Sequence, residues 1–536
     1  MIERNKYLHG TGYDRGNGRS NGGGQPRLVK KSRHSIHGGA LKVCLVVPNF
    51  RWTDSDPNAL WQYFPYNLCM ITAMIEEEYH VNILDAYSSN MSQEEFRSAL
   101  AKQDPDVVGI TVLMDQYAPA GHETAKIVKE SNEKVKVVLG GVYATTNPEK
   151  AASDPNIDYV VIGEGEYVFH DLLDFFLGKK PLPEKGLAYR SNGQVVVTCR
   201  ADFIDDLDAL PFPSYHLIDF QSYANASPTR KSVDAPLVYP FARLVTTRGC
   251  PYLCSFCQAK AITGREFRYR SVENIMDEIQ WLKDKYGVKS LIFDDDNLYT
   301  NKERAKVFFR RMSERGLAMP WKSIATAVFR LDEELVKLMR ESGCEYVDVA
   351  IESGTERVMR EIIKKPIIFD RAKEMIRCLR QQGIYVAANF IIGFPTETWE
   401  EVRQTIKMAE DMNCDYVKIF IALPLPETEL YELTKKHNAF KQERKTAGRI
   451  WSTGQMIETE YWRADDLTVL RAYEWDRINF TDPVKRKRTA DMMGITVEEL
   501  DQIRMRTLGD ACLKIKESDA PDGDKELIAQ GTYPCT

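Results

Sequence analysis

The sequence has no long hydrophobic run and no strong excess of charge of either sign. No apolar stretch approaches the roughly 18–20 residues that span a bilayer, and residues 1–24 lack the apolar centre of a secretory signal. The formal net charge of -6 over 536 residues argues against a dedicated binder of nucleic acid. We therefore expect a cytoplasmic protein with no membrane span and no nucleic-acid partner.

The eleven cysteines do not form a disulfide framework, because their number is odd and they are scattered along a long chain. Five of them lie in apolar or helical surroundings, which is typical of small buried hydrophobic residues. These are Cys44, Cys69, Cys344, Cys378 and Cys414. Only Cys250, Cys254 and Cys257 form a cluster, so a functional role is expected there.

The chain does contain enough apolar residues for more than one core. Hydrophobic residues make up 43% and charged residues 28%, which is typical of a globular protein. A chain of 536 residues predicts two or three domains. Residues 1–40 are rich in Gly, Arg, Asn and Ser and are expected to be a disordered basic tail.

Two series of β-rich runs alternate with helical stretches. The first occupies residues 41–190, with runs at 42–47, 81–84, 106–111, 136–140 and 159–163. This rhythm predicts a doubly wound, flavodoxin- or Rossmann-like parallel sheet, with ligands at the carboxyl ends of its strands. Residues 191–240 contain many prolines and are interpreted as a linker.

The second series predicts six βα units across residues 241–430. Its runs lie at 241–247, 288–293, 323–328, 346–351, 384–392 and 415–422. Six units favour a partial (β/α)6 barrel over a closed barrel of eight, again with the site at the carboxyl ends of the strands. Residues 431–536 lack this β pattern and predict a small, mostly helical C-terminal cap.

The clustered cysteines follow the first strand of the predicted barrel, as Cys250-x3-Cys254-x2-Cys257 within TTRGCPYLCSFCQ. Structural zinc needs four ligands, and neither a second cysteine pair nor a histidine is nearby. A [4Fe–4S] cluster normally takes four thiolates, so three would leave one iron open to a small molecule. The spacing therefore predicts an iron–sulfur cluster with a vacant iron.

This loop, with Phe256 before its last cysteine, resembles that of the radical S-adenosylmethionine (SAM) superfamily. IFDDDN (292–297), Arg330, AIESG (350–354) and IIGFPTET (391–398) extend the resemblance over about residues 241–430. It implies that the amino and carboxylate groups of SAM bind the open iron. Reduction by a donor such as flavodoxin or ferredoxin would then release a 5′-deoxyadenosyl radical, which abstracts hydrogen from a substrate.

The resemblance also suggests contacts to SAM. An aspartate among residues 294–296 would receive the SAM ammonium, Arg330 its carboxylate, and Glu352 and Ser353 the ribose. Backbone near Ile391 and Gly393 would address adenine. The full expected set is Phe256, Asp295, Asp296, Arg330, Glu352, Ser353, Ile391 and Gly393. An acidic triplet at the end of a strand can also be a solvated turn, and Arg330 can instead form a surface ion pair. Which of the three aspartates would contact SAM stays open.

Residues 137–149 and 158–166 resemble the cobalamin-binding domain that precedes many radical SAM domains. The resemblance implies contacts from glycines that let backbone approach a flat macrocycle, and from Thr111 to the nucleotide tail or a corrin amide. The expected set is Thr111, Gly140, Gly141, Gly163, Glu164 and Gly165. The Asp-x-His-x-x-Gly cobalt-ligand motif is absent from residues 41–190, so no histidine is expected on the cobalt. Glycines that only make turns, or a domain without cofactor, are the alternatives.

These features together predict a methylcobalamin-dependent radical SAM methyltransferase. It would methylate an unactivated sp³ carbon or phosphorus of a small specialised metabolite, and we expect it to act as a monomer. Tyr473 and Trp475 are candidate substrate contacts, or else packing residues of a helix. A cyclase or rearrangement enzyme without methyl transfer is the main alternative. A methylthiotransferase is disfavoured because its three further upstream cysteines are not clustered here, and a non-catalytic sensor remains a third possibility.

Overall fold

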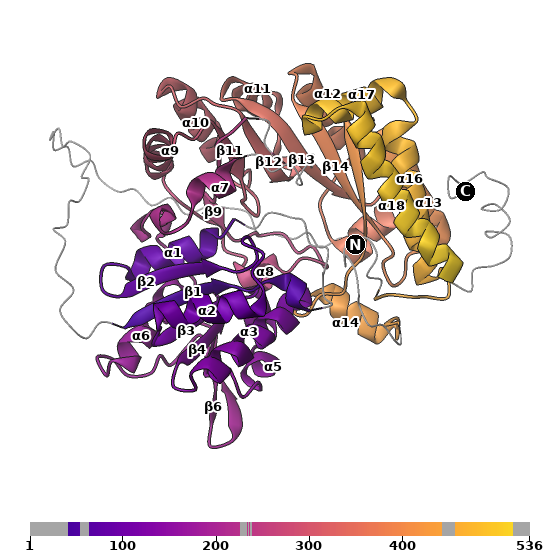
Figure 1. Cartoon of the computed structure of the whole chain (residues 1–536). Helices are drawn as coiled ribbons and strands as arrows, with labels where there is room; N and C mark the ends of the chain where they lie inside the picture. The colour runs from indigo at the N-terminus through magenta and orange to yellow at the C-terminus, as the bar shows by residue number, and fades with distance from the viewer. Residues whose placement is uncertain are drawn as a thin grey trace, which may run out of the picture.

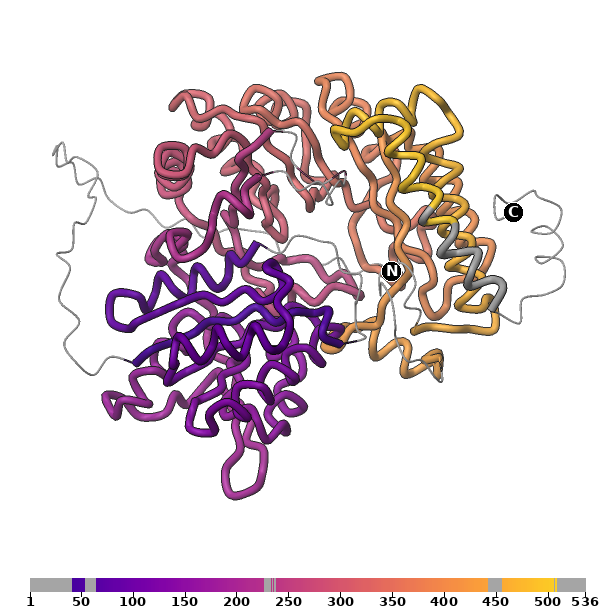
Figure 2. Tube along the Cα trace, in the orientation of Figure 1, coloured from indigo at the N-terminus to yellow at the C-terminus, as the bar shows by residue number. Residues whose placement is uncertain are grey.

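The structure of the chain is a computed structural model that describes residues 41–53, 64–225, 233, 235, 238–441 and 456–517. The expectation of a disordered tail over residues 1–40 falls outside these ranges. Two α/β units lie against each other, and a layer of helices covers the free side of the second (Figure 1). Figure 2 follows the chain from the indigo N-terminal unit through the second unit to the yellow C-terminal helices.

The N-terminal unit is a doubly wound sheet in the order β2-β1-β3-β4-β5-β6-β7. The first five strands are parallel, as the sequence predicts, and the last two pair antiparallel. The strands are β1 (Lys42–Val47), β2 (His80–Asp85), β3 (Val107–Thr111), β4 (Lys136–Gly140), β5 (Tyr159–Val161), β6 (Leu187–Ser191) and β7 (Gln194–Val197). The helices are α1 (Tyr66–Ile75), α2 (Gln93–Gln103), α3 (Ala118–Ser131), α4 (Val142–Thr146), α5 (Pro148–Ala152) and α6 (Gly165–Phe176).

Helices cover both faces of this sheet, which explains its nearly continuous apolar strands. Helix α1 packs with α6, and α2 packs with α3. Every residue of β3 is buried. The β6–β7 hairpin extends the sheet beyond the predicted five strands, and its turn uses Asn192 and Gly193, both at positive φ.

The second unit is an open barrel of six parallel strands in sequential order, from β8 to β15. This confirms the predicted succession of a parallel sheet and a partial barrel. The strands are β8 (Phe241–Leu244), β11 (Ser290–Phe293), β12 (Trp321–Thr326), β13 (Cys344–Glu352), β14 (Tyr385–Ile392) and β15 (Tyr416–Ile421). The outer helices are α9 (Val272–Tyr286), α10 (Lys302–Glu314), α11 (Glu333–Glu341), α12 (Phe369–Gln381) and α13 (Trp399–Asp411).

Short elements connect these units and surround the cysteines. Strands β9 (Thr247–Arg248) and β10 (Arg268–Tyr269) pair antiparallel, with α8 (Ala259–Ile262) between them in sequence. The other short elements are η1 (Phe50–Trp52), η2 (Asp115–Tyr117), η3 (Leu207–Ala209), η4 (Tyr215–Leu217), α7 (Phe220–Ala224), η5 (Val328–Arg330) and the π-helix η6 (Val358–Ile363).

The described part of the C-terminal region is mostly helical. It consists of α14 (Glu429–Lys436), α16 (Ala464–Phe480), α17 (Pro483–Met493) and α18 (Val497–Glu517). Helix α16 lies on β15, where Asn479 accepts from the backbone N–H of Val417 at 2.8 Å and donates to its carbonyl at 2.8 Å. Arg471 donates to the carbonyl of Ile419 at 2.9 Å. Among the described helices, none has the length and apolarity that a bilayer crossing requires.

Two glycines that end barrel helices should differ sharply in their tolerance of alanine. Gly316 and Gly343 both have positive φ, at 65° and 105°. A Cβ at Gly316 would meet nothing within 4 Å, whereas one at Gly343 would lie 2.1 Å from the carbonyl oxygen of Met319. We expect Gly316→Ala to lower the free energy of unfolding by roughly 1–2 kcal/mol, and Gly343→Ala to lower it clearly more. Urea unfolding of both variants tests this, and equal losses would contradict it.

Candidate functional site

The three clustered cysteines lie on a loop at the carboxyl end of the barrel strands. Gly249, which precedes the loop, has φ +86°, and a Cβ there would lie 2.0 Å from the carbonyl oxygen of Glu266. The backbone N–H of Cys250 donates to the carbonyl of Gly264 at 3.1 Å. Only glycine therefore allows the two ends of the segment 249–268 to approach so closely.

The donor set of this loop fits an iron–sulfur cluster. Burial raises the pKa of the Cys254 thiol to about 12 and that of the Cys257 thiol to about 11. The three cysteines lie within eight residues of this loop, and the backbone N–H of Cys257 donates to the carbonyl of Cys254 at 3.1 Å. Cys250 and Cys254 are half-buried and Cys257 is exposed. Three thiolates so close in one loop need a strongly positive partner, and a [4Fe–4S] cluster held by three cysteines keeps one iron open.

The three neighbouring aspartates have different surroundings. Asp294 forms an ion pair with Arg243 of β8. Asp295 is only 3% exposed, and its Oδ1 accepts from the backbone N–H of Thr246 at 2.8 Å, from the Thr246 hydroxyl at 2.9 Å and from the Thr247 hydroxyl at 2.7 Å. Burial raises the pKa of Asp295 to about 6. Asp295 thus ties β11 to the residues that lead into the cysteine loop, so we assign it to holding that loop rather than to contacting SAM.

Asp296 is the exposed aspartate of the three. Its carboxylate accepts from the hydroxyl of Thr263 at 2.5 Å, and its charge contributes to raising the pKa of Cys257, after the larger effect of burial. It therefore faces the cysteine loop and remains the better candidate for the SAM ammonium.

Glu352 and Ser353, at the end of β13, have different environments. Glu352 has φ +76° and pairs with Lys365 at 2.8 Å. Lys365 also donates to the carbonyl of Ala350 at 2.7 Å. The hydroxyl of Ser353 is fully enclosed and contacts the hydroxyls of Thr355 and Thr405. Glu352 thus remains a candidate ribose contact, while the observed partners of Ser353 give it a structural role.

Arg330 and Phe256 both lie beside elements of the cysteine loop. Arg330 donates to the carbonyl of Thr300 and lies within hydrogen-bonding reach of Tyr252, inside the loop. The ring of Phe256 lies 6.4 Å from that of Phe394, between centroids. The cysteine loop therefore meets the end of β14 and the turn that follows it, where the predicted contacts Ile391 and Gly393 lie, in the strand and in the turn respectively.

That turn is organised by Glu397, a residue the sequence analysis did not single out. Gly393 has φ +89°, and its N–H donates to Glu397 Oε2 at 2.6 Å. Phe394 donates to the same oxygen at 3.1 Å, and the indole of Trp462 donates to the Glu397 carbonyl at 2.9 Å. The Glu397 carboxylate thus holds the backbone that would contact adenine in place. In the sequence, only the position of Glu397, three residues after Phe394, could have pointed to this role.

Stability should depend on pH through Glu397. Burial raises its pKa to about 8 from the ordinary 4.5, so the folded chain keeps a proton that the unfolded chain releases. The free energy of unfolding should therefore fall as pH rises from about 4.5 to 8. Glu397→Gln cannot ionise and should lose this contribution, gaining stability relative to the native chain across that window. Urea unfolding at pH 5, 6.5 and 8 measures it, with exposed Glu400→Gln as control. Parallel curves for native chain and Glu397→Gln would contradict the prediction.

A cavity of about 260 Å³ lies at the carboxyl ends of the N-terminal strands. All six residues expected to contact cobalamin border it: Thr111, Gly140, Gly141, Gly163, Glu164 and Gly165. The hydroxyl of Thr111 accepts from Asn67 at 2.9 Å. The N–H of Gly163 donates to the Thr145 hydroxyl at 3.0 Å. Asn67 and Thr145 carry no sequence signal that marks them as part of this site.

This cavity suits a flat heterocycle. Apolar side chains such as Leu45, Ile71 and Phe169 line it beside a few polar groups. At Gly140 a Cβ would meet nothing within 4 Å, so backbone borders open space there. The opposite wall comes from the barrel, through Arg248 and the segment 262–263. The residues present thus fit the planar tail or ring of a cobalamin.

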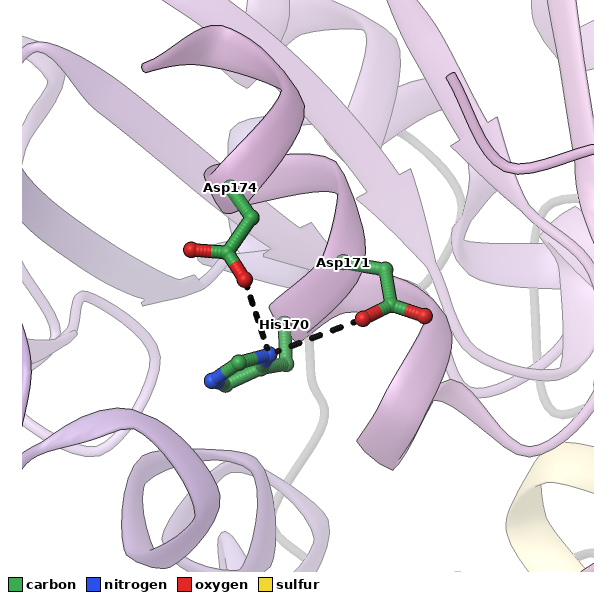
Figure 3. Close-up of side chains that lie close together, drawn as sticks. All are labelled: His170, Asp171 and Asp174. Carbon is green, nitrogen blue, oxygen red and sulfur yellow. Dashed lines mark ion pairs between the residues drawn. The ribbon is translucent and has the colours of Figure 1, made fainter. Parts of the chain in front are cut away.

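Two histidines of the N-terminal unit, His122 and His170, have partners away from this cavity. The His122 ring contacts Asp154 at 2.6 Å and the Tyr143 hydroxyl at 2.9 Å. His170 lies on α6 beside Asp171 and Asp174 (Figure 3). Lys180 pairs with both of these carboxylates, at 2.6 and 3.0 Å, so the group forms an ion-pair network on the surface of α6.

Trp475, a candidate substrate contact, lies far from the cysteine loop. Its indole donates to the hydroxyl of Tyr416, the first residue of β15, at 2.8 Å. Because the strands are parallel, Tyr416 marks the amino ends of the barrel, opposite the loop. Trp475 therefore packs helix α16 onto the barrel. Tyr473 is half-buried on the same helix.

Comparison with known proteins identifies both units. Residues 244–409 match the model of the radical SAM superfamily, and residues 59–173 match that of the B12 binding domain. An uncharacterized methyltransferase of Pyrococcus horikoshii is 35% identical, over 70% of this chain and 79% of the relative. Cytidylyl-2-hydroxyethylphosphonate methyltransferase of Streptomyces wedmorensis is 29% identical, over 76% and 85%.

Other relatives differ in the reaction that their names describe. Anaerobic magnesium-protoporphyrin IX monomethyl ester cyclase of Rubrivivax gelatinosus is 28% identical, over 75% of this chain and 72% of the relative. Among solved structures, the radical SAM methyltransferase TsrM of Kitasatospora setae has a similar fold. Its TM-score is 0.61 at 19% identity, over 76% of this chain and 79% of that one.

Proposed function

The chain belongs to the cobalamin-dependent radical SAM methyltransferase family, and from that premise we propose that it methylates an unactivated carbon or phosphorus of a small, polar specialised metabolite. Membership rests on the relative that is 35% identical over 79% of its length, together with the two matched domains. The family's cofactors are a [4Fe–4S] cluster, SAM and cobalamin. The proposal is carried by one observation, that a single cavity has glycines of the N-terminal sheet on one wall and residues flanking the cysteine loop on the other.

The residues of this chain would divide the work of binding and orientation. When bound, the cluster with SAM supplies the means to remove a hydrogen atom from an unactivated centre, and cobalamin supplies the methyl group. Cys250, Cys254 and Cys257 would hold the cluster. Asp296 and Glu352 would orient SAM beside it, with Lys365 fixing the Glu352 carboxylate through the 2.8 Å contact.

The inner face of the barrel supports a polar substrate. Residues such as Leu244, Val347 and Val417 point outward into the core beneath the helices, so their neighbours on each strand point inward. Two ion pairs involve these inward positions: Arg243 pairs with Asp294, which directly follows β11, and Lys418 pairs with Asp348 at 2.6 Å. A lumen with paired charges favours a substrate that carries hydrogen-bonding and charged groups.

A cyclase or rearrangement reaction is the second candidate, and the cyclase relative at 28% identity is the observation that favours it. Anaerobic turnover separates the two, with reconstituted cluster, cobalamin, a low-potential reductant and SAM labelled in its methyl group. Extract fractions from the source cell would supply the substrate. Labelled product with S-adenosylhomocysteine supports methyl transfer. Product without label, alongside 5′-deoxyadenosine, would instead establish the cyclase. No SAM cleavage in any fraction would refute both.

A further inference from the structure

A buried group of four charged side chains joins the N-terminal unit to the barrel; we call it the interdomain ion cluster. It consists of Glu164 and Glu166, at the start of α6, with Arg248 of β9 and Arg268 of β10. The two terminal guanidinium nitrogens of Arg268 donate to the two carboxylate oxygens of Glu164, at 2.8 and 2.9 Å. Arg248 contacts Glu164 at 3.3 Å and Glu166 at 2.5 Å. The four side chains are between 4% and 14% exposed.

The two arginines bracket the cysteine segment. Arg248 is separated from Cys250 only by Gly249, whose backbone is pinned against Glu266. Arg268 ends the segment and donates to the carbonyl of Thr263 at 2.6 Å. Because the N–H of Cys250 bonds to Gly264, the segment between the arginines is closed on itself. A shift of either arginine must therefore move the cysteine loop.

The two glutamates belong to the wall of the other site. Glu164 lies between Gly163 and Gly165, and all three border the cavity that fits cobalamin. Glu164 also accepts from the backbone N–H of Ile204 at 2.8 Å, and Arg268 donates to the Ile204 carbonyl at 2.7 Å. The segment between the domains is thus held in the same network. Both carboxylates and Arg248 thus border the cavity. Arg248 also precedes the cysteine segment, and Arg268 closes it.

Net stability is a poor explanation for such a group. Burying four charges costs much of the energy that their attraction returns, and well-packed apolar residues often serve as well or better. Bidentate arginine–carboxylate pairs do, however, fix distance and orientation closely. We propose that Glu164 and Glu166, acting through Arg248 and Arg268, are positioning residues that set the cobalamin cavity at one fixed distance and angle from the cysteine loop.

This inference rests on the proposed function only for its cofactors, and it does not require methyl transfer. Two cofactors that act on one substrate must be aligned, and a misplacement of 1 Å can cost about 10²-fold in rate. Glu164→Gln keeps the shape of the side chain but removes the charge. Arg268→Lys keeps the charge but loses the bidentate hydrogen bonding to Glu164. Asp476→Asn is the control, because Asp476 forms an equally bidentate pair with Arg504, at 2.8 and 3.0 Å, within the C-terminal helices.

The test is electron paramagnetic resonance of the holoenzyme with reduced cluster and cob(II)alamin. The magnetic coupling between the two centres depends on their separation and orientation. We expect Arg268→Lys to bind native amounts of iron and cobalamin but to show altered coupling, with methyl transfer lowered roughly 10²-fold. Glu164 itself borders the cobalamin cavity, so Glu164→Gln should show altered coupling in the fraction that holds cobalamin, and Asp476→Asn should show a native spectrum.

A native spectrum from Arg268→Lys would overturn the proposal. If that variant does not fold, the cobalamin-bound fraction of Glu164→Gln decides in the same way, since native coupling in it would equally overturn the proposal. Failure of the proposed function has a different signature. The native chain would then form no methylated product, while the difference in coupling between native chain and variants would persist.

Discussion

Replacing Cys254 by alanine is expected to abolish SAM cleavage while leaving cobalamin binding intact. Two thiolates cannot hold a cluster that needs three protein ligands, so the reconstituted variant should lose most of its iron and the visible absorption of the cluster. Formation of 5′-deoxyadenosine should fall to background. The cavity for cobalamin lies across the interface from Cys254, and Cys254 is not among the residues that line it. Iron content, absorption and 5′-deoxyadenosine measured on one preparation test all three expectations.

The matched control for this experiment is Cys378→Ala. Cys378 is a half-buried free cysteine on α12, outside the loop. It should keep native iron content and native SAM cleavage. The assignment of the cluster would be wrong if Cys254→Ala retained native iron, or if Cys378→Ala lost as much.

Leucine at position 140 is expected to block cobalamin binding without harming the fold. Gly140 borders the cavity, and its Cβ direction is open for 4 Å, so a leucine side chain would project into the space that the cofactor needs. We expect cobalamin affinity to fall at least tenfold, about 1.4 kcal/mol, with an unchanged free energy of unfolding. Equilibrium dialysis with hydroxocobalamin and urea unfolding measure the two quantities.

The adjacent glycine provides the contrast. Gly141 has φ +97°, and a Cβ there would lie 2.6 Å from the carbonyl oxygen of Val112. Gly141→Ala should therefore lower the free energy of unfolding as well as cobalamin binding. Native affinity in Gly140→Leu would show that this cavity is not where cobalamin binds.

Local patterns in the sequence predicted most of the fold. Each βα unit has its own apolar strand, amphipathic helix and glycine stop, so the six barrel strands and five parallel strands were visible one at a time. The β6–β7 hairpin was missed because it forms no core of its own. Its outer strand, β7, has no buried residue, and the hairpin becomes part of the sheet only by pairing with β5. Pairing with a distant edge leaves little periodic signal in the sequence.

The sequence likewise predicted only those parts of the site whose residues are close together along the chain. The cysteine loop was readable because its ligands lie within eight residues of one another along the chain. The different roles of Asp295 and Asp296 could not be predicted from the sequence, because only packing decides which carboxylate is enclosed by Thr246 and Thr247. Arg268 and Glu164 are 104 residues apart, so no spacing rule could have joined them. Glu397 was overlooked because its partners are backbone amides of a turn.

The contacts of α16 with β15 have a further consequence for the behaviour of the protein in solution. An open barrel leaves β15 with a free edge, and exposed backbone groups on such an edge can recruit a strand from another molecule. Asn479 occupies the amide and carbonyl of Val417, and Arg471 occupies the carbonyl of Ile419. Side chains thus replace the missing seventh strand. Helix α16 thereby prevents strands of other molecules from pairing with the open edge of the barrel, and so protects against aggregation.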